Sequence, residues 1–378
     1  MGEVLVQVSS NSALKIAVFP GDGIGPEVMD PCIVLLEDLA ASLDGLGFDF
    51  TSLPAGADHY RATGEALPEA SVDAAAGADA ILLGAMGDPA VRYADGREIA
   101  PQVDLRERFA LFAGVRPIVT YPGMRVPLAD PRAQHLDVVL IREQTEGLFA
   151  GRDTGTVTGD TAQDTLTNTR AASERLFDFA FDLARERRAA GRAGEVTCVD
   201  KANIFRSFAF FRGVFDAQAR HFPDVVARHA YVDAAALKLV TQPWAFDVMV
   251  TENLLGDILS DMGAGLMGGM GMAPSADIGP DHAVFQPCHG TAPDIAGTGR
   301  ANPTAMFLSA AMMLDWLAER HEAPAAATAG RLLDGAVRAA FAGGDLHPFE
   351  QGGSDGVAAV TDAVRRALER QPVATSGT

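Results

Sequence analysis

FDVMVTENLLGDILSD, residues 246–261, joins an apolar run to a helical pattern, the unit from which folds of alternating strands and helices are built. The apolar run covers residues 248–250, after which Asn253, Asp257 and Asp261 recur every four residues. Side chains at this spacing lie above one another on one face of a helix. Two carboxylates there repel each other, so the pattern and the glycine-rich run after it favour a bound Mg²⁺ or Mn²⁺. The alternative is a solvent-exposed face with the same spacing by chance.

The composition is that of a soluble globular protein, with 48% hydrophobic and 21% charged residues. A chain of 378 residues is too long for one compact core, which predicts two domains. The net charge of −20 argues against nucleic acid and anionic membranes as partners, but a few arginines suffice to bind an anionic small molecule. Three widely spaced cysteines fit neither a disulfide framework nor a zinc site. No signal peptide or membrane-spanning run is visible, so the expected compartment is the cytoplasm.

Further strands and helices alternate along the chain and predict an α/β architecture with parallel strands. Buried strands are expected at LKIAVFP (14–20), ADAILLGAMG (78–87), LDVVLI (136–141) and EVTCVD (195–200), and helices at about 170–190 and 204–221. Arg142 and Glu143 are expected just past the third of these strands. In such sheets ligands bind outside the carboxyl ends of the strands, where Arg142 and Lys201 are expected to stand.

Three segments fall outside this alternation. The first ten or so residues are expected to form a loose extension or an extra strand. The polar, threonine-rich stretch 151–168 is interpreted as a loop or as a β-arm that reaches a partner. A short alanine-rich stretch near 323–329 is interpreted as a linker.

The segment GDGIGPEV, residues 21–28, is similar to a dinucleotide-binding fingerprint but departs from it at the third glycine position, which is Pro26. We therefore expect a tight turn beside a different site. Gly25 and Pro26 fit a turn that runs into the first position of a helix.

Charged residues near the predicted strand ends are candidates for a site. Arg106, Arg116 and Arg142 together would grip a di- or tricarboxylate, although a single arginine is more often a surface charge. Lys201 follows an apolar strand, where partial desolvation would suit it to proton transfer; the alternative is a lysine that extends to water. Asp233 lies in an apolar stretch, so we expect it to be buried with a cation or hydrogen-bond donor, or to cap a helix.

The stretch FQPCHGTAPDIAGTGRANP, residues 285–303, is rich in turn residues, and its backbone amides would suit a phosphate or a ribose. Asp294 would accept hydrogen bonds from ribose hydroxyls and repel a 2′-phosphate, which favours NAD over NADP. His289 is expected either to organise this loop or to act in catalysis.

Six motifs now carry a family resemblance: GDGIGPEV, DLRERFALFAGVRP, IREQTEGLFAG, DKANIF, TENLLGDILSD and HGTAPDIAGTGRANP. In their order, and over residues 15 to about 365, the chain resembles the β-decarboxylating dehydrogenases, which comprise isopropylmalate, isocitrate, homoisocitrate and tartrate/D-malate dehydrogenases. The isopropylmalate and homoisocitrate types are nearest in motif pattern. The resemblance implies a homodimer with shared active sites and a large twisted mixed sheet in two domains. The implied parts are a cofactor-binding domain (1–111 with 268–378), a substrate, metal and dimerisation domain (112–267) and a dimer-clasping arm (151–168).

The resemblance also implies roles for individual residues. Arg106, Arg116 and Arg142 would bind the substrate carboxylates. One subunit would supply the metal ligands Asp257 and Asp261 for Mg²⁺ or Mn²⁺, and the other Asp233 together with the proton acceptor Lys201. The implied NAD-binding residues are His289, Gly290, Thr291, Ala292, Asp294 and Asn302, with Asn203 near the nicotinamide.

Three departures from the family pattern bear on the reaction. The family's proton-donating tyrosine is matched by Phe149, which has no proton to give. Isocitrate enzymes carry serine and asparagine where this chain has Ala100 and Gln102, and isopropylmalate enzymes carry leucines where it has Gln102 and Val103. Gln286 stands where relatives often carry a glutamate.

The sequence thus predicts NAD- and metal-dependent oxidative decarboxylation of a 2-hydroxy-3-substituted succinate. Two alternatives remain. One is a dehydrogenase that keeps the carboxylate or acts on a tartrate- or D-malate-type acid, and the other is a catalytically silent homologue, for which Phe149 is the only support.

Overall fold

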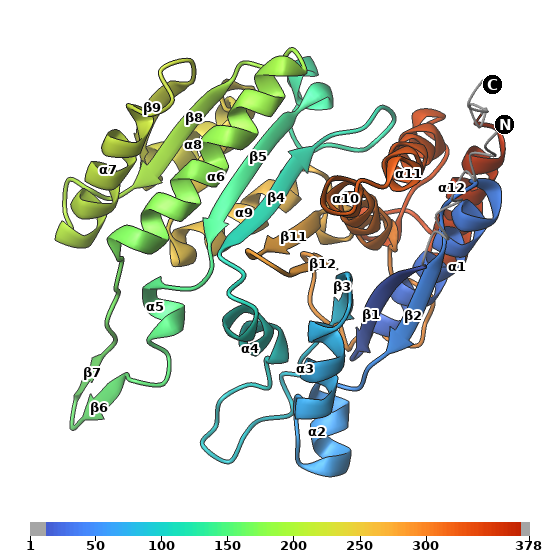
Figure 1. Cartoon of the computed structure of the whole chain (residues 1–378), viewed down its shortest axis with the longest axis horizontal. Coiled ribbons are helices and arrows are strands. Elements are labelled where there is room, and N and C mark those ends of the chain that lie inside the picture. Colours follow the sequence, from blue (N-terminus) through green and yellow to red (C-terminus); the bar gives the residue numbers. More distant parts are fainter. Residues whose placement is uncertain (1–12, 372–378) are drawn as a thin grey trace, which may run out of the picture.

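A computed structural model describes residues 13–371, so the predicted N-terminal extension lies outside the described residues. Within this part of the chain, ten strands form one sheet (Figure 1). Their order is β2 (Phe48–Ser52), β1 (Leu14–Gly21), β3 (Ala80–Ala85), β12 (Ala283–Pro287), β11 (Pro274–Ile278), β4 (Ala113–Val119), β5 (Asp137–Glu143), β10 (Val248–Thr251), β8 (Glu195–Asp200) and β9 (Val226–Tyr231).

The sheet is mixed, as the family resemblance implied. β11 runs antiparallel to both β12 and β4, and β4 runs antiparallel to β5, whereas the other neighbouring pairs are parallel. The predicted parallel strands are therefore present, but a block of antiparallel pairing lies in the middle of the sheet. The α/β fold class is confirmed.

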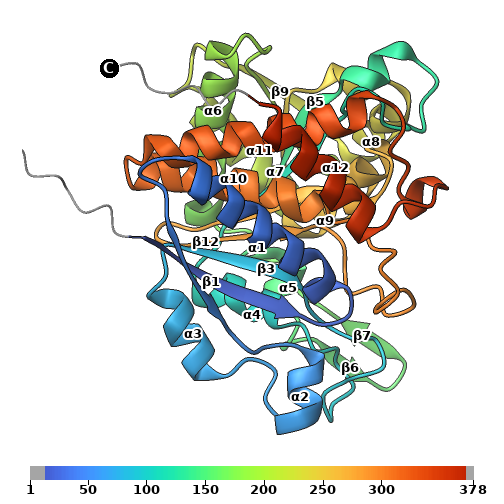
Figure 2. The same ribbon diagram turned by 90° about the vertical axis from the view of Figure 1, so that its right-hand side faces the viewer.

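Helices cover both faces of the sheet because its central strands are apolar on both sides. In β5, Val138 and Leu140 pack into one core and Val139 and Ile141 into another. The first face is covered by α1 (Gly25–Ser42), α8 (Val232–Thr241), α9 (Asn253–Leu266) and α10 (Thr304–Arg320), with α11 (Pro324–Ala342) and α12 (Val357–Glu369) packed outside them (Figure 2). The opposite face carries α2 (Ala57–Thr63), α3 (Glu69–Ala76), α4 (Pro101–Arg108), α6 (Arg170–Ala189) and α7 (Arg206–Ala219).

The segment that opened the sequence analysis forms β10 and α9 as predicted. β10 is buried along its length, and α9 begins directly after Glu252. The Glu252 carboxylate accepts hydrogen bonds from the amides of Leu254 and Leu255, which satisfies two of the free N–H groups at the helix start. The helices predicted at 170–190 and 204–221 correspond to α6 and α7, and α1 begins at Gly25.

Two sequence interpretations were wrong. The alanine-rich stretch near 323–329 is no linker but the first turns of α11, because alanine is the best helix former and Ala326 and Ala329 are buried against the core. Arg142 lies inside β5 rather than beyond it, since the strand continues through pairing with β4.

The stretch 151–168 forms a small hairpin of β6 (Thr156–Thr158) and β7 (Thr161–Gln163). It stands away from the body of the molecule below α5 (Gly147–Ala150), and its residues are exposed (Figure 1). The structure thus favours the β-arm over the loop. None of the described helices is long and apolar enough to cross a membrane.

Candidate active site

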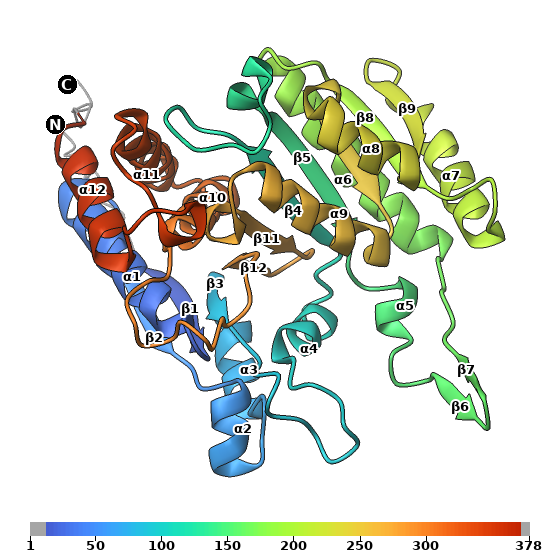
Figure 3. The same ribbon diagram turned by 180° about the vertical axis from the view of Figure 1, so that it is seen from behind.

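A cavity of about 240 Å³ lies among α4, β4, β5, α9 and the segment after β12, elements that Figure 3 shows from the α9 side. It gathers the residues predicted to bind substrate, the position of the family's tyrosine, two of the predicted metal ligands and the start of the predicted cofactor loop. Those members are Gln102, Val103, Arg106, Arg116, Arg142, Phe149, Asp257, Asp261, His289 and Gly290.

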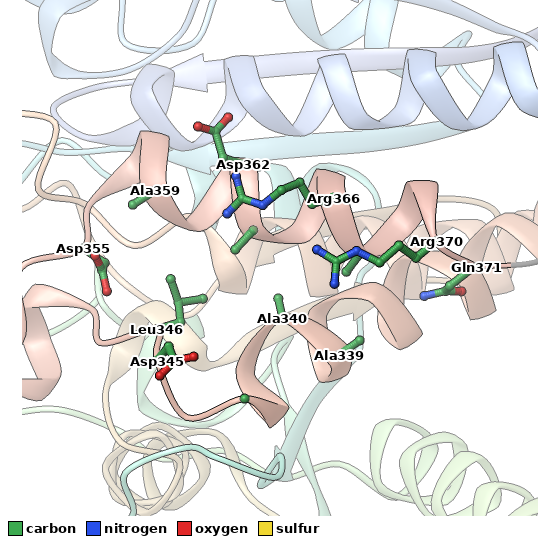
Figure 4. A pocket seen from close by; sticks show the side chains of 13 residues that line it. Ala339, Ala340, Asp345, Leu346, Asp355, Ala359, Asp362, Arg366, Arg370 and Gln371 are labelled. Atoms are coloured by element: carbon green, nitrogen blue, oxygen red, sulfur yellow. The ribbon is translucent and has the colours of Figure 1, made fainter.

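A larger hollow of about 660 Å³ lies elsewhere, between the end of α11 and α12 (Figure 4). Alanines form much of its wall, and Arg366 and Arg370 of α12 line it together with aspartates such as Asp345 and Asp362. It contains none of the residues singled out from the sequence. The side chains of the smaller cavity, and not its size, therefore identify the candidate site.

The three arginines reach the smaller cavity from three elements. Arg106 comes from α4, Arg116 from β4 and Arg142 from β5. Arg116 alternates with Ile118, and Arg142 with Leu140, on the face of the sheet that α9 covers. Strand periodicity therefore aims both guanidiniums at α9, where the predicted acidic residues stand.

Arg142 is held in a single position. Its side chain is 4% exposed, its Nε and Nη2 donate to Asn253 Oδ1 at 3.0 and 2.8 Å, and its Nη1 pairs with Asp257. Gly256 makes the room, because a Cβ atom there would lie 2.8 Å from the Cβ of Arg142. Burial and the charge of Arg106 lower the pKa of Arg142 to about 10, so the guanidinium stays charged near neutral pH.

Phe149 lines the same cavity from α5. The Arg142 guanidinium carbon lies 5.0 Å from the centre of its ring, a cation–π contact. The aromatic ring thus occupies the cavity wall and helps to hold the arginine, but it offers no donor or acceptor to a bound molecule.

Asp257 and Asp261 stand one turn apart on α9 and both line the cavity. Burial, followed by the charge of Asp257, raises the pKa of Asp261, so the two carboxylates do repel each other as the spacing predicted. A divalent cation would relieve this repulsion, and the donor set is of the hard oxygen type that Mg²⁺ or Mn²⁺ prefers. Within residues 13–371 no group of three acidic, histidine or cysteine side chains converges, so Asp257 and Asp261 are the two members of the predicted metal-binding set that this cavity brings together.

Lys201 and Asp233 lie together but outside this cavity. Lys201 follows β8, Asp233 is in the first turn of α8, and Lys201 Nζ donates to Asp233 Oδ1 at 2.6 Å. The expectation that Asp233 is buried was wrong for the single chain. Its side chain is 68% exposed, because the first turn of α8 faces solvent, and it makes no side-chain cap. Asn203 belongs to the same exposed turn after β8.

The predicted cofactor loop borders a second cavity of about 260 Å³. His289 lines both cavities, Ala292 and Asn302 line the second, and Gly290 lines the first. Asp294 is exposed on the same loop. His289 Nδ1 lies 2.9 Å from the carbonyl oxygen of Gly290, while its buried Nε2 has no protein partner among the described residues. That nitrogen is available to a bound molecule.

The GDGIGPEV turn packs directly against this loop. This agrees with the prediction of a tight turn beside a different site. The amide of Ile24 donates to the carbonyl oxygen of Thr291 at 2.9 Å. Gly23 has a φ of +58°, and a Cβ atom there would lie 2.1 Å from that same oxygen. Only glycine allows the turn to approach the loop so closely.

Sequence reasoning missed two carboxylates at the site, of which Asp277 is buried. Asp277, on β11, lies between Arg106 and Arg116. Glu350 accepts hydrogen bonds from Asn302 Nδ2 at 2.7 Å and from the amide of Gly271 at 2.9 Å beside the second cavity. A lone aspartate in the five-residue apolar strand PSADI was the available signal for the first; Glu350 gave none.

The comparisons with known proteins agree with this geometry. Residues 15–363 match the family described as isocitrate/isopropylmalate dehydrogenase. The 3-isopropylmalate/3-methylmalate dehydrogenase of Methanocaldococcus jannaschii is 42% identical over 338 residues, which cover 89% of this chain and 96% of that protein.

Two solved structures share the fold. The isocitrate dehydrogenase of Methylococcus capsulatus is 35% identical, with a TM-score of 0.82 over 94% of this chain and 100% of that one. A β-decarboxylating dehydrogenase of Thermococcus kodakarensis is 32% identical, with a TM-score of 0.73 over 94% and 96%.

Proposed function

Since the chain belongs to the isocitrate/isopropylmalate dehydrogenase family, whose members are decarboxylating dehydrogenases acting on hydroxy acids, we propose that it oxidises a 2-hydroxy-3-substituted succinate with NAD⁺ and releases the 3-carboxylate as CO₂. The observation that carries this proposal is one cavity with three arginines, two adjacent aspartates and the start of the His289–Gly290 loop. This set combines carboxylate binding, cation binding and a neighbouring cofactor site.

Each group has a proposed task. Arg106, Arg116 and Arg142 bind the two substrate carboxylates and fix the C2 hydrogen toward the nicotinamide. Asp257 and Asp261, with Asp233 of the partner subunit, would hold a divalent cation that supplies Lewis acidity beside the 2-hydroxyl and its carboxylate.

The remaining tasks fall to the partner's lysine and the glycine-rich loop. Lys201 of the partner subunit accepts the proton of the 2-hydroxyl. The loop from His289 through Asp294, together with Asn302, would hold NAD⁺, which would supply the hydride acceptor. Asn203 of the partner subunit would lie near the nicotinamide.

The test measures NADH and CO₂ independently, with purified protein, Mg²⁺ or Mn²⁺, NAD⁺ and a panel of 3-substituted malates. Equal yields of the two products support the proposal. NADH without CO₂ would instead support a dehydrogenase that keeps the carboxylate, and no NADH over the whole panel would contradict both.

The residues that line the cavity restrict which 3-substituents the substrate can carry. Gln102 and Val103 face it together with Met86, and the Gln102 Oε1 atom is buried without a hydrogen-bond partner in the described part of the chain. An entirely apolar substituent would leave this oxygen unpaired, which costs about 1–3 kcal/mol. We therefore favour a small substituent that carries a hydrogen-bond donor.

We also propose a homodimer with shared sites. Large apolar side chains are exposed around Lys201 and Asp233 and along the adjoining helices, a pattern expected where a partner subunit packs. They are Ile204, Phe205, Leu237, Val240 and Ile258. α8 and α9, which carry three of them, lie side by side on the outer surface (Figure 3).

The double substitution Leu237→Glu and Ile258→Glu is expected to convert dimers into monomers, since it places charges inside the proposed interface. Light scattering after size-exclusion chromatography should report twice the chain mass of 39.6 kDa for the wild type and that mass for the variant, which should also lose activity. Val34→Glu, at an exposed apolar position on α1, is the matched control and should remain dimeric. A double variant that stays dimeric would argue against this interface.

The domain division proposed from the resemblance places its borders at 111/112 and 267/268. In support, the border separates β11 from β4, and the opposite face of the sheet has separate cores around Phe19 on one side and Phe215 on the other.

Phe149→Tyr is expected to raise turnover by about tenfold with an accepted substrate, because a phenol at this position can protonate the enolate formed after CO₂ leaves. The measurement is kcat together with the ratio of CO₂ to NADH. Phe48→Tyr, at a half-buried position on β2, is the control for adding a hydroxyl elsewhere. If turnover does not rise for any accepted substrate, protonation from this position does not limit the enzyme.

A further inference from the structure

Asp277 is the centre of a buried hydrogen-bond network that connects Arg106 and Arg116. Its side chain is 1% exposed. Oδ1 accepts hydrogen bonds from Arg116 Nη2 at 2.8 Å and from Gln144 Nε2 at 2.6 Å, and Oδ2 accepts from Arg106 Nε at 2.9 Å and from Gln286 Nε2 at 3.0 Å. Every donor in this network is a side chain, and two of them belong to the proposed carboxylate clamp.

The Asp277 carboxylate is ionised in the folded protein. Burial by itself would raise the pKa of Asp277, but the charges of Arg106 and Arg116 and the hydrogen bond from Gln144 outweigh it and hold the pKa well below its usual value. The two glutamines add donors without adding charge. One negative charge is therefore built permanently into the wall of the arginine cluster.

We infer that Asp277 is a positioning and specificity-determining residue: it fixes Arg106 and Arg116 and cancels one of three guanidinium charges, so that the site selects a substrate with two carboxylates and an uncharged 3-substituent. This inference rests on the proposed function, since it assumes that the arginine cluster binds the substrate.

The charge balance supports it. Asp277 leaves two positive charges among the three arginines, and Asp257 and Asp261 match the charge of the divalent cation they would hold. Asp233 and Lys201 of the partner subunit carry opposite charges that cancel. Two carboxylates neutralise the remainder. A third carboxylate would be desolvated without a counter-charge, which is strongly unfavourable in a buried site. The residues beside the expected 3-substituent, Gln102 and Val103, offer it no cation.

Gln286 provides a way to move the charge without removing it. Its amide nitrogen donates to Asp277 Oδ2, so the pair Asp277→Asn with Gln286→Glu exchanges carboxylate and amide within one hydrogen bond. Gln286→Glu alone adds a second negative charge at the same place. The three variants thus change the charge of the cluster by plus one, zero and minus one.

The experiment measures the affinity of the wild type and these variants for succinate, a dianion, and tricarballylate, a trianion, by calorimetry with Mg²⁺ present. Asp277→Asn is expected to raise the ratio of trianion to dianion affinity by about tenfold, because it makes the arginine cluster one charge more positive and a desolvated site responds strongly to charge complementarity. The double variant should return the ratio to within about threefold of the wild type. Gln286→Glu should shift it about tenfold in the opposite direction, and this holds as a test even if Asp277→Asn does not fold.

An unchanged ratio in a folded Asp277→Asn or Gln286→Glu protein would overturn the inference, as would an equal loss of affinity for both anions, which is the result for a purely structural aspartate. Because the measurement needs no turnover, its outcome is separate from that of the NADH and CO₂ assay. Wild-type protein that discriminates between the anions by this charge rule but oxidises no malate analogue would contradict the proposed function instead.

Discussion

Replacing Lys201 with methionine is expected to lower kcat by about 10³-fold, because removing the proton acceptor for the 2-hydroxyl takes away a contribution of general-base catalysis that is typically 10²–10⁴-fold. Methionine keeps the length and apolar stem of the side chain. The Michaelis constant for NAD⁺ should change little. Lys15→Met, which alters an exposed lysine on β1, is the matched control and should keep full activity.

The same variant tests whether the sites are shared. Lys201→Met and Asp257→Asn are each expected to be inactive alone, yet after denaturation and refolding together they should recover about a quarter of wild-type activity. Half of the dimers are then mixed, and each mixed dimer has one site with both wild-type residues. Recovery near zero would mean that Lys201 and Asp257 act within one chain, and would contradict the shared site.

Arg142→Met is expected to lower kcat/KM by about 10²–10³-fold, mostly through KM, because it removes one buried half of a charge pair with the substrate and leaves Asn253 and Asp257 without their donor. Arg142→Lys should recover only part of this loss, since an ammonium group cannot reproduce the fork of bonds to Asn253 and a carboxylate. The measurement is steady-state kinetics with the best substrate of the panel.

The control for Arg142 is Arg132→Met. Arg132 is exposed and pairs with Asp130, so its loss should leave kcat/KM within about twofold of the wild type. If Arg142→Met and Arg132→Met have similar kinetics, the cavity between β5 and α9 does not bind the substrate. A melting temperature for each variant separates loss of binding from loss of folding.

The parts of the site that follow local periodicity could be predicted from the sequence. Asp257 and Asp261 share a face of α9 because four residues make nearly one turn. Arg142 lies near the carboxyl end of its strand, as expected, although β5 includes it and its alternation with Leu140 directs it to the cavity. Lys201 follows a strand whose length the apolar run already defines.

What escaped prediction depends on contacts between distant segments. Asp277 meets Arg106 and Arg116 only because β11 pairs with β4, which lies some 160 residues earlier in the chain. The residues next to Asp277 in the sequence do not indicate that these arginines are its partners. The prediction that Asp233 is buried was wrong for a related reason. An apolar stretch indicates that a helix is covered, but it does not indicate whether the same chain or a second chain covers it.

Gly256 shows how the demands of a helix and of its neighbour can conflict. A glycine inside a helix costs up to about 1 kcal/mol relative to alanine, and a search for stabilising substitutions would choose this position early. Yet even a methyl group here would press on the stem of the arginine that crosses the helix. Thermostabilised versions of this protein should therefore keep the glycine, accepting a weaker helix to leave the guanidinium where it is.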